Sequence, residues 1–142
     1  MPTVNIRFPR LVCGALLPLA LLAACATVTP ATPEEAVAKR AQARFDALIA
    51  KDFKAAYGFF TPSYRDMMNY ENWIRSRPPR ASFRTARVLK VECPSADACK
   101  VEMETAYDSP RGVKAAPKGL IERVVPERWV RVEGEWWLFQ AR

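Results

Sequence analysis

A change in hydrophobic period near residue 78 constrains the fold of this chain more than any other feature. Before it, apolar residues recur at spacings of three and four, as in helices that bury one face. After Pro78-Pro79, apolar and polar residues alternate, as in strands. Helices grouped ahead of strands indicate an α+β fold, with N-terminal helices packed on an antiparallel sheet.

The helical half predicts three segments. Thr32 followed by Pro33 and Glu35 has the form of a capping box and predicts a helix start. An apolar stripe follows on one face of this helix, and it consists of Val37, Ala41, Phe45, Leu48 and Ile49. Arg40 and Arg44 are predicted to lie on the other faces. A second helix is predicted from Asp52 to about Phe60, and a third segment carries residues 64–74.

Aromatic residues gather on one side of these later helices. They are Tyr57, Phe60, Tyr64, Tyr70 and Trp73. Such a stripe forms part of a core in most proteins, and alternatively it lines a pocket for an apolar ligand. The acids nearby, Asp46, Asp52 and Asp66, are candidates for chemistry or for helix caps and surface charges.

The first predicted hairpin joins residues 83–93 to residues 99–107 through a five-residue loop from Pro94 to Ala98. If Cys93 faces Cys99, three opposite-charge pairs share one face, which supports that register. These pairs are Glu92–Lys100, Lys90–Glu102 and Arg84–Asp108. The two cysteines are expected to form a disulfide, because the export signal described below implies an oxidising compartment. A metal site is the alternative, and two Cys in a chain without His make a poor one.

In that register Arg87 shares the inward face with Tyr107, beside Leu89 and Val91. An inward Arg could hold a carboxylate or a phosphate with a bidentate grip. The alternative is a structural ion pair with Asp46 or Asp52, or a side chain that extends to solvent. Arg87 and Tyr107 therefore join Tyr57, Tyr64 and Trp73 as candidates for a ligand pocket.

The second predicted hairpin joins residues 120–132 to residues 135–141, with a tight turn at Glu133-Gly134. Pro126 cannot donate a ladder hydrogen bond, so it predicts a bulge or an edge. Trp129 and Trp136 fall on one face and Trp137 on the other. Both faces are apolar, and these three Trp residues are the predicted partner surface.

The N-terminus has the pattern of an export signal. Arg7 and Arg10 precede the apolar residues 11–24, which are too short to span a bilayer as a helix. Leu22-Ala23-Ala24-Cys25 resembles the bacterial lipobox. The resemblance implies that Cys25 becomes the mature N-terminus and carries a diacylglycerol thioether and an acyl chain of the palmitate type. The alternative is an ordinary signal peptide with Cys25 free.

This processing divides the chain into a signal peptide (1–24), a lipidated Cys with a Thr- and Pro-containing tether (25–33), and one domain (34–142). Removal of two Arg lowers the formal charge from +7 to +5. Ala26 after the lipidated Cys resembles the outer-membrane default, which places the domain in the periplasm. Nucleic acid is excluded as a partner by that compartment. The basic run, Arg75, Arg77, Arg80, Arg84 and Arg87, could contact anionic lipid headgroups or form a solvated face.

Several short motifs resemble small NTF2-like domains. Residues 44–52 (RFDALIAKD), 56–57 (AY) and 61–65 (TPSYR) are similar to their helical opening, and residues 134–138 (GEWWL) look like their last hairpin. The resemblance implies a cone with a cavity between the concave sheet and the helices. Many such domains bind without catalysis, whereas others are isomerases, cyclases or dehydratases that use acids, Tyr or His.

The chain has no His, which excludes the Ser-His-Asp triad, the Cys-His pair and a His general base. We therefore expect a lipid-anchored periplasmic lipoprotein with a non-catalytic binding or accessory domain, for an envelope protein or a small apolar or anionic ligand. No cofactor or metal is expected. One alternative is a SnoaL-like or ketosteroid-isomerase-like enzyme that uses a cavity acid and a Tyr, and another is a purely structural lipoprotein.

Overall fold

The computed structural model describes residues 31–77, 82–108 and 119–141, and it confirms the α+β arrangement. The helices are α1 (Pro33–Ile49), α2 (Phe53–Gly58), α3 (Pro62–Met67) and α4 (Tyr70–Ser76). The strands are β1 (Phe83–Ser95), β2 (Ala98–Asp108), β3 (Leu120–Val132) and β4 (Glu135–Phe139). Pro78-Pro79, the predicted boundary between the two halves, lies outside the described residues. None of the helices in the described ranges is long and apolar enough to cross a membrane.

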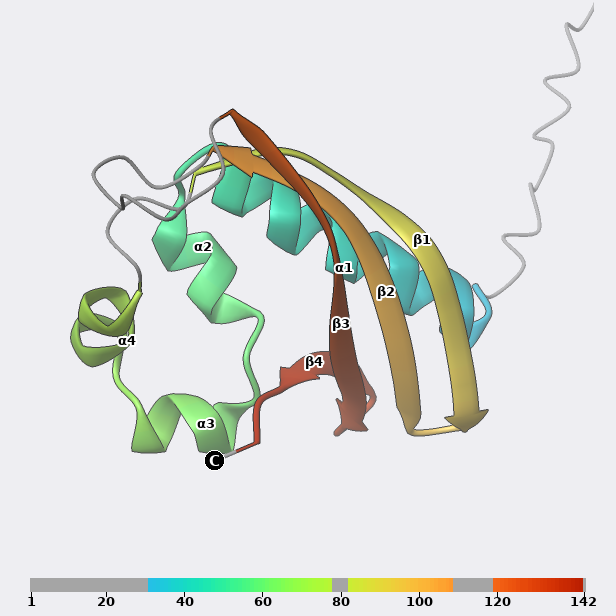
Figure 1. Cartoon of the computed structure of the whole chain (residues 1–142). Helices are drawn as coiled ribbons and strands as arrows, with labels where there is room; N and C mark the ends of the chain where they lie inside the picture. Colours follow the sequence, from blue (N-terminus) through green and yellow to red (C-terminus); the bar gives the residue numbers. More distant parts are fainter. Residues whose placement is uncertain (1–30, 78–81, 109–118, 142) are drawn as a thin grey trace, which may run out of the picture.

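Helix α1 begins as predicted. Thr32 is the N-cap, and its side chain and that of Glu35 form the reciprocal bonds of a capping box. The predicted stripe is buried from Val37 to Leu48, and it packs on the inner face of the curved sheet (Figure 1). Arg44 is buried as well, so the prediction that it lies on a different face from the apolar stripe is wrong.

The third predicted helical segment is two helices. Met68 adopts an extended backbone conformation, which ends α3. The next residue, Asn69, is the N-cap of α4, and its side chain accepts a hydrogen bond from the Asn72 amide. A side chain that competes for backbone bonds in this way favours a new helix start over continuation. Asp52 caps α2 in the same manner, by accepting from the Ala55 amide.

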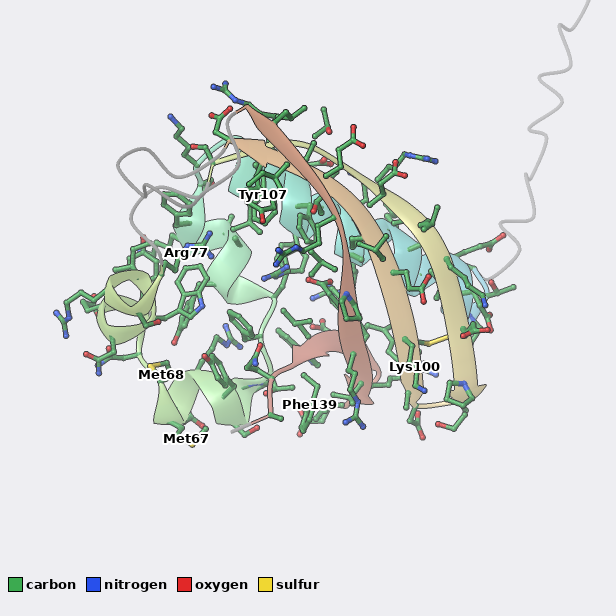
Figure 2. All side chains as sticks on the ribbon, in the orientation of Figure 1. Met67, Met68, Arg77, Lys100, Tyr107 and Phe139 are labelled. Atoms are coloured by element: carbon green, nitrogen blue, oxygen red, sulfur yellow. A yellow bond between two sulfur atoms is a disulfide. The ribbon has the colours of Figure 1, made fainter. Side chains whose placement is uncertain are left out.

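The four strands form one antiparallel sheet in the order β1-β2-β3-β4. In the β1–β2 hairpin, Glu92 pairs with Lys100 and Lys90 with Glu102, as predicted. The connection is shorter than predicted, because β1 continues to Ser95, which pairs with Ala98. Cys93 and Cys99 form a disulfide across this end of the hairpin (Figure 2).

The β3–β4 hairpin has the predicted bounds of β3, the predicted turn and the predicted register. Glu133 and Gly134 both have positive φ, which is the conformation of the favoured two-residue hairpin turn. β4 pairs with residues 128–132 of β3, so Pro126 lies where β3 has no β4 partner. The outer side of β4 is bonded to the chain after α2, through the Leu138 amide to the Phe59 carbonyl (2.8 Å).

Candidate functional site

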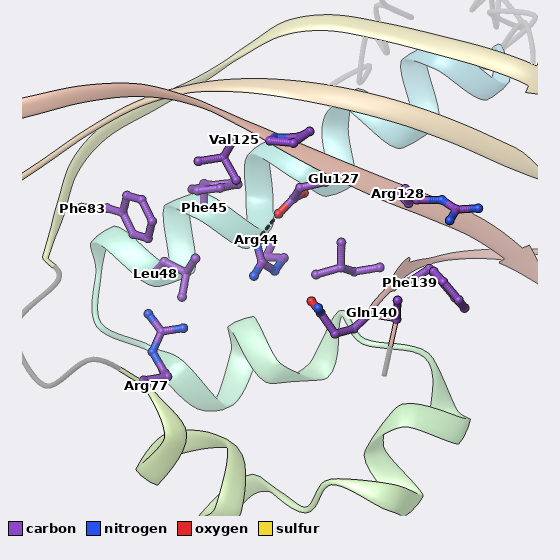
Figure 3. A pocket seen from close by; sticks show the side chains of 13 residues that line it. Arg44, Phe45, Leu48, Arg77, Phe83, Val125, Glu127, Arg128, Phe139 and Gln140 are labelled. Carbon is purple, nitrogen blue, oxygen red and sulfur yellow. Dashed lines mark hydrogen bonds and ion pairs between the residues drawn. The ribbon is translucent and has the colours of Figure 1, made fainter.

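A cavity of about 500 Å³ lies between α1 and the part of β3 that β4 leaves uncovered (Figure 3). It exists because β4 is short, so that residues 120–127 of β3 have no neighbour on this side among the described strands. α1 contributes Arg44, Phe45 and Leu48 to its wall, and β3 contributes residues 125–128. Arg77 and Phe83 lie at one end, and residues 138–141 lie at the other (Figure 3).

A buried ion pair forms one wall of this cavity. Arg44 on α1 donates a hydrogen bond from Nη1 to Oε1 of Glu127 on β3 (Figure 3). The indole Nε1 of Trp129 donates to the second carboxylate oxygen, Oε2, at 3.0 Å. Both oxygens of Glu127 are therefore engaged. The Nε of Arg44 is buried and has no hydrogen-bond partner in the described part of the chain.

Burial opposes the charges of this pair. It raises the pKa of Glu127, against the opposing effects of the Arg44 charge and the two hydrogen bonds. Burial also lowers the pKa of Arg44, and the negative charge of Glu127 opposes this decrease. Both directions have the same physical cause, which is the loss of water around a charged group.

Arg77 is a second cation at the cavity. It follows α4, and its guanidinium lies over the rings of Trp73 (4.9 Å) and Phe53 (5.1 Å). Burial lowers the pKa of Arg77, and the positive charge of Arg44 lowers it further. Within the described ranges Arg77 has no salt bridge. Arg44 and Arg77 are thus close enough at this cavity to repel each other, and Glu127 is bonded to Arg44.

The predicted aromatic candidates on the helices pack in or against the hydrophobic core. Tyr57 packs against Trp73 (5.5 Å between ring centroids) and Tyr70 (5.6 Å). Its hydroxyl lies 2.8 Å from the Met68 carbonyl, and burial raises the pKa of Tyr57. Trp73 is buried and does not line the cavity, although its ring contacts the cavity residue Arg77. Tyr64 lines a separate hollow of about 470 Å³ beside Asp66 and Phe139.

The prediction that Arg87 faces inward is wrong. A bulge at Leu89 shifts the β1–β2 register, so that Arg87 pairs with Glu104 and not with residue 105. Its side chain is exposed on the outer face and forms a salt bridge with Glu104. Leu89 is 46% exposed for the same reason. Tyr107 remains half-buried, and its ring meets that of Phe83 at 6.0 Å.

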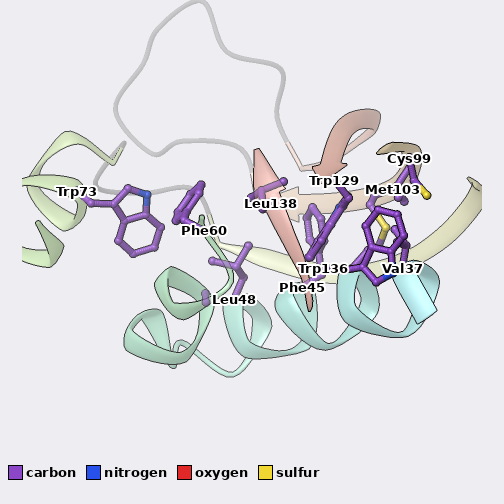
Figure 4. Packing of buried hydrophobic residues seen from close by; sticks show 13 residues of the cluster. Val37, Phe45, Leu48, Phe60, Trp73, Cys99, Met103, Trp129, Trp136 and Leu138 are labelled. Carbon is purple, nitrogen blue, oxygen red and sulfur yellow. The ribbon is translucent and has the colours of Figure 1, made fainter. Parts of the chain in front are cut away.

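Two of the three predicted partner-surface Trp residues are core (Figure 4). Trp129 is 0% exposed and Trp136 is 6% exposed, and both belong to the hydrophobic cluster beneath α1. The prediction that they form a partner surface is therefore wrong, because α1 covers the face of the hairpin on which they lie. Trp137 is half-buried between the guanidinium groups of Arg40 (5.3 Å) and Arg65 (5.2 Å). Phe139 beyond it is 39% exposed.

The predicted basic run does not form one surface. Arg84 forms the predicted ion pair with Asp108 at 2.7 Å, but the predicted register is wrong there, because Phe83 pairs with Tyr107. Arg75 contacts Asn72. Arg77 lines the cavity, whereas Arg80 lies outside the described residues. The candidate acid Asp46 accepts a hydrogen bond from Gln42 at 2.9 Å. Cys25 and most of the tether also lie outside the described residues.

Arg44 and Glu127 were not identified from the sequence. Glu127 does carry a signal, since it lies between Val125 and Trp129 at the two-residue spacing of an inward face. Arg44 carries none, because an Arg beside a helical apolar stripe is usually solvated. No group of three or more His, Cys, Asp or Glu within the described ranges could hold a metal ion.

Comparison with known proteins yields a similarity of fold. No family model matches the chain. No curated protein matches it either. The solution structure of a SEC-C motif containing protein from Rhodopseudomonas palustris is similar, with a TM-score of 0.50 and 20% sequence identity, over 77% of this chain and 76% of that one. At this identity the chain shares an α+β fold with that protein, and the likeness extends to the fold alone.

Proposed function

We propose that this chain is a lipid-anchored lipoprotein of the bacterial cell envelope, whose NTF2-like domain binds a small ligand without transforming it. The lipobox-like residues 22–25 support the anchor, and Ala26 favours the outer membrane with the domain in the periplasm. The curved sheet with helices on its inner face supports the NTF2-like cone (Figure 1). The observation that carries the binding function is the cavity of about 500 Å³, within the ~300–1,000 Å³ range of small-ligand sites.

The chemistry of the lining favours binding over catalysis. Glu127 is the one acid among the described lining residues, and both of its oxygens already accept hydrogen bonds. Hydrogen bonds from a cation and from an indole stabilise the ionised carboxylate, which makes it a weaker general base. The hydroxyl of Tyr57, the other group that an enzyme of this fold could use, lies at the carbonyls of Arg65 and Met68 instead.

The binding function is tested by filling the cavity. In the full-length, detergent-extracted protein, Val125→Trp places an indole at a residue that lines the cavity. Val124→Trp, one residue away and 47% exposed, is the matched control. Thermal shift is measured against a panel of decyl compounds with different head groups. We expect at least one compound to stabilise the wild type and the control but not Val125→Trp, and equal stabilisation of all three proteins would contradict the proposal.

The anchor is tested separately. Cells that express the wild type, Cys25→Ser or Cys13→Ser are labelled with a fatty acid that carries an alkyne tag. We expect the label in the wild type and in Cys13→Ser, because Cys13 lies in the segment that is removed. Label retained on Cys25→Ser would refute acylation at Cys25 and leave the cavity proposal untouched.

The enzyme alternative is favoured by one observation, the raised pKa of the Glu127 carboxyl at a cavity wall. It is tested by incubating a periplasmic small-molecule extract with the wild type and with Glu127→Gln, followed by mass spectrometry. Under the binding proposal the two proteins leave the same product profile. A product formed by the wild type alone would contradict the binding proposal and support an enzymatic function.

A further inference from the structure

We propose that the ligand of this cavity carries an anionic oxygen head group, a carboxylate or a phosphate, that is held between Arg77 and the free side of Arg44, with an apolar remainder against the cavity wall. This inference rests on the proposed ligand-binding function and specifies the chemical class of the ligand. It follows from three features of the lining, which are its charge, its unused hydrogen-bond donors and its apolar walls.

The charge of the lining is positive, and the side chains in the described ranges do not neutralise it. The lining holds Arg44, Arg77 and Arg128 against one acid, Glu127. Arg128 lies over the ring of Phe139 at 5.2 Å and is exposed to water. All 15 Asp and Glu side chains of the chain fall within the described ranges, and none of them forms a salt bridge with Arg77. The missing counter-charge at Arg77 is therefore not a side-chain carboxylate of this domain.

Arg44 keeps a donor that the chain does not use. A guanidinium carries five N–H donors, and Arg44 places Nη1 on Glu127. Its Nε is fully buried, whereas Nη2 is not and forms no hydrogen bond in the described part of the chain. Because Arg44 lines the cavity, Nη2 is the donor that it offers to a bound oxygen.

Arg77 is held in position for such a contact. The Cζ of Arg77 lies over the rings of Trp73 and Phe53, at 4.9 and 5.1 Å from the ring centroids. Ring contacts on the face of a guanidinium leave the N–H groups at its edge available, and these groups match the two oxygens of a carboxylate or phosphate. Burial lowers the pKa of Arg77, and the charge of Arg44 lowers it further, so an anion between the two guanidinium groups would relieve their repulsion.

The remaining wall is apolar. Phe45, Leu48, Phe83 and Val125 line the cavity beside the two cations (Figure 3). A ligand that satisfies both parts of the lining is an anionic amphiphile with a single chain. A polar anion such as inorganic phosphate would leave the apolar wall in contact with water, so it is expected to bind more weakly.

The test uses the full-length, detergent-extracted protein and four probes with the same decyl chain, namely decanoate, decyl phosphate, decanol and decyltrimethylammonium. Affinity is measured by titration calorimetry. We expect decanoate or decyl phosphate to bind at least about tenfold more tightly than the neutral and cationic probes, because a hydrogen bond to a charged group contributes about 1.5–3 kcal/mol. The better of the two anions identifies the head group.

Arg77→Gln should lower the affinity for the preferred anion about tenfold or more. Arg75→Gln changes an exposed residue in the last turn of α4, two positions before Arg77, and is the matched control that should bind as the wild type does. Circular dichroism confirms that both variants fold. Salt dependence supplies a measurement on the wild type alone, since anion binding at a cationic site should weaken as ionic strength rises.

The outcomes separate this inference from the broader function. Equal binding of decanol and decanoate, both lost in Val125→Trp, would preserve the binding function and overturn the anionic head group. Unchanged anion affinity in folded Arg77→Gln, or an affinity independent of salt, would also overturn it. If none of the four probes binds the wild type, both the inference and the proposed function fail for ligands of this size.

Discussion

Arg44 and Glu127, 83 residues apart in the chain, meet as a buried ion pair that joins α1 to β3 at the cavity wall. Their side chains are 10% and 5% exposed, so the contact forms largely out of water. A buried ion pair of this kind is weak support for stability, because the cost of removing water offsets much of the attraction. Its measurable consequence is a dependence of stability on pH.

We predict that Glu127 makes the free energy of unfolding fall as pH rises. Burial raises the pKa of Glu127 in the folded state above its unfolded value. Between those two pKa values the folded chain binds more protons than the unfolded chain. The stabilisation that Glu127 contributes is therefore complete below the unfolded pKa and is lost as pH rises through the folded pKa. Glu127→Gln lacks this contribution.

Urea unfolding at several pH values checks this prediction. The unfolding free energy of the wild type minus that of Glu127→Gln should decrease from acid to neutral pH. Glu122→Gln, an exposed acid on the same strand, controls for the loss of one carboxylate. A difference that increases with pH would mean that Arg44 outweighs burial and that the folded pKa is lowered.

Trp129 and Trp137 are predicted to differ sharply when truncated. Trp129 is 0% exposed and bonds to Glu127, so Trp129→Ala should cost about 3–5 kcal/mol, comparable to the whole stability of many domains. Trp137→Ala removes a half-buried ring and two cation–π contacts, which are worth about 1–2 kcal/mol together. Chemical denaturation measures both, and a cost for Trp137→Ala equal to that of Trp129→Ala would contradict this assignment.

Because Trp137→Ala should fold, it also tests the protein-partner reading of the envelope function. Selective co-purification with the wild type but not with Trp137→Ala would support a partner at this face. Trp136 is unsuitable for that test, since it is 6% exposed and its truncation would disturb the core.

Local patterns predicted much of the fold. The capping box at Thr32, the stripe from Val37 to Leu48 and the turn at Glu133-Gly134 each depend on neighbouring residues, and each is confirmed. The break at Asn69 was missed because the apolar residues continue at helical spacing on both sides of it. The preference of Asn for the N-cap position starts a new helix at that residue.

The site was harder to predict because it depends on contacts between distant segments. A single bulge at Leu89 reverses the face of Arg87, and no local signal marks it. The apolar character of the last hairpin was recognised, but its coverage by α1 on one face is a tertiary fact. Arg44 is buried at the cavity because it pairs with Glu127, which lies 83 residues further along the chain.

Arg87→Ala is predicted to change little. The Arg87 and Glu104 side chains are 66% and 44% exposed, and a surface ion pair is worth about 0–1 kcal/mol. We expect the unfolding free energy to fall by less than about 1 kcal/mol and the affinity for any cavity ligand to stay unchanged. A large loss of ligand affinity in folded Arg87→Ala would place the ligand on the outer face of the sheet and contradict the site described above.

The disulfide between Cys93 and Cys99 is predicted to stabilise the domain without being required for its fold. It closes a short loop at the end of the β1–β2 hairpin, and in the chain-entropy model such a loop contributes about 2–2.5 kcal/mol. The ladder from Phe83 to Lys90 lies outside the loop that the bridge closes, so we expect the sheet to persist when the bridge is absent. Reduction of the processed wild type should therefore lower the urea midpoint and release both thiols, while the circular dichroism spectrum in the absence of urea is retained. Cys93→Ala/Cys99→Ala should show a similar lowered midpoint and no response to the reductant, and a wild-type midpoint that ignores the reductant would show that the two cysteines are not bridged in the exported protein.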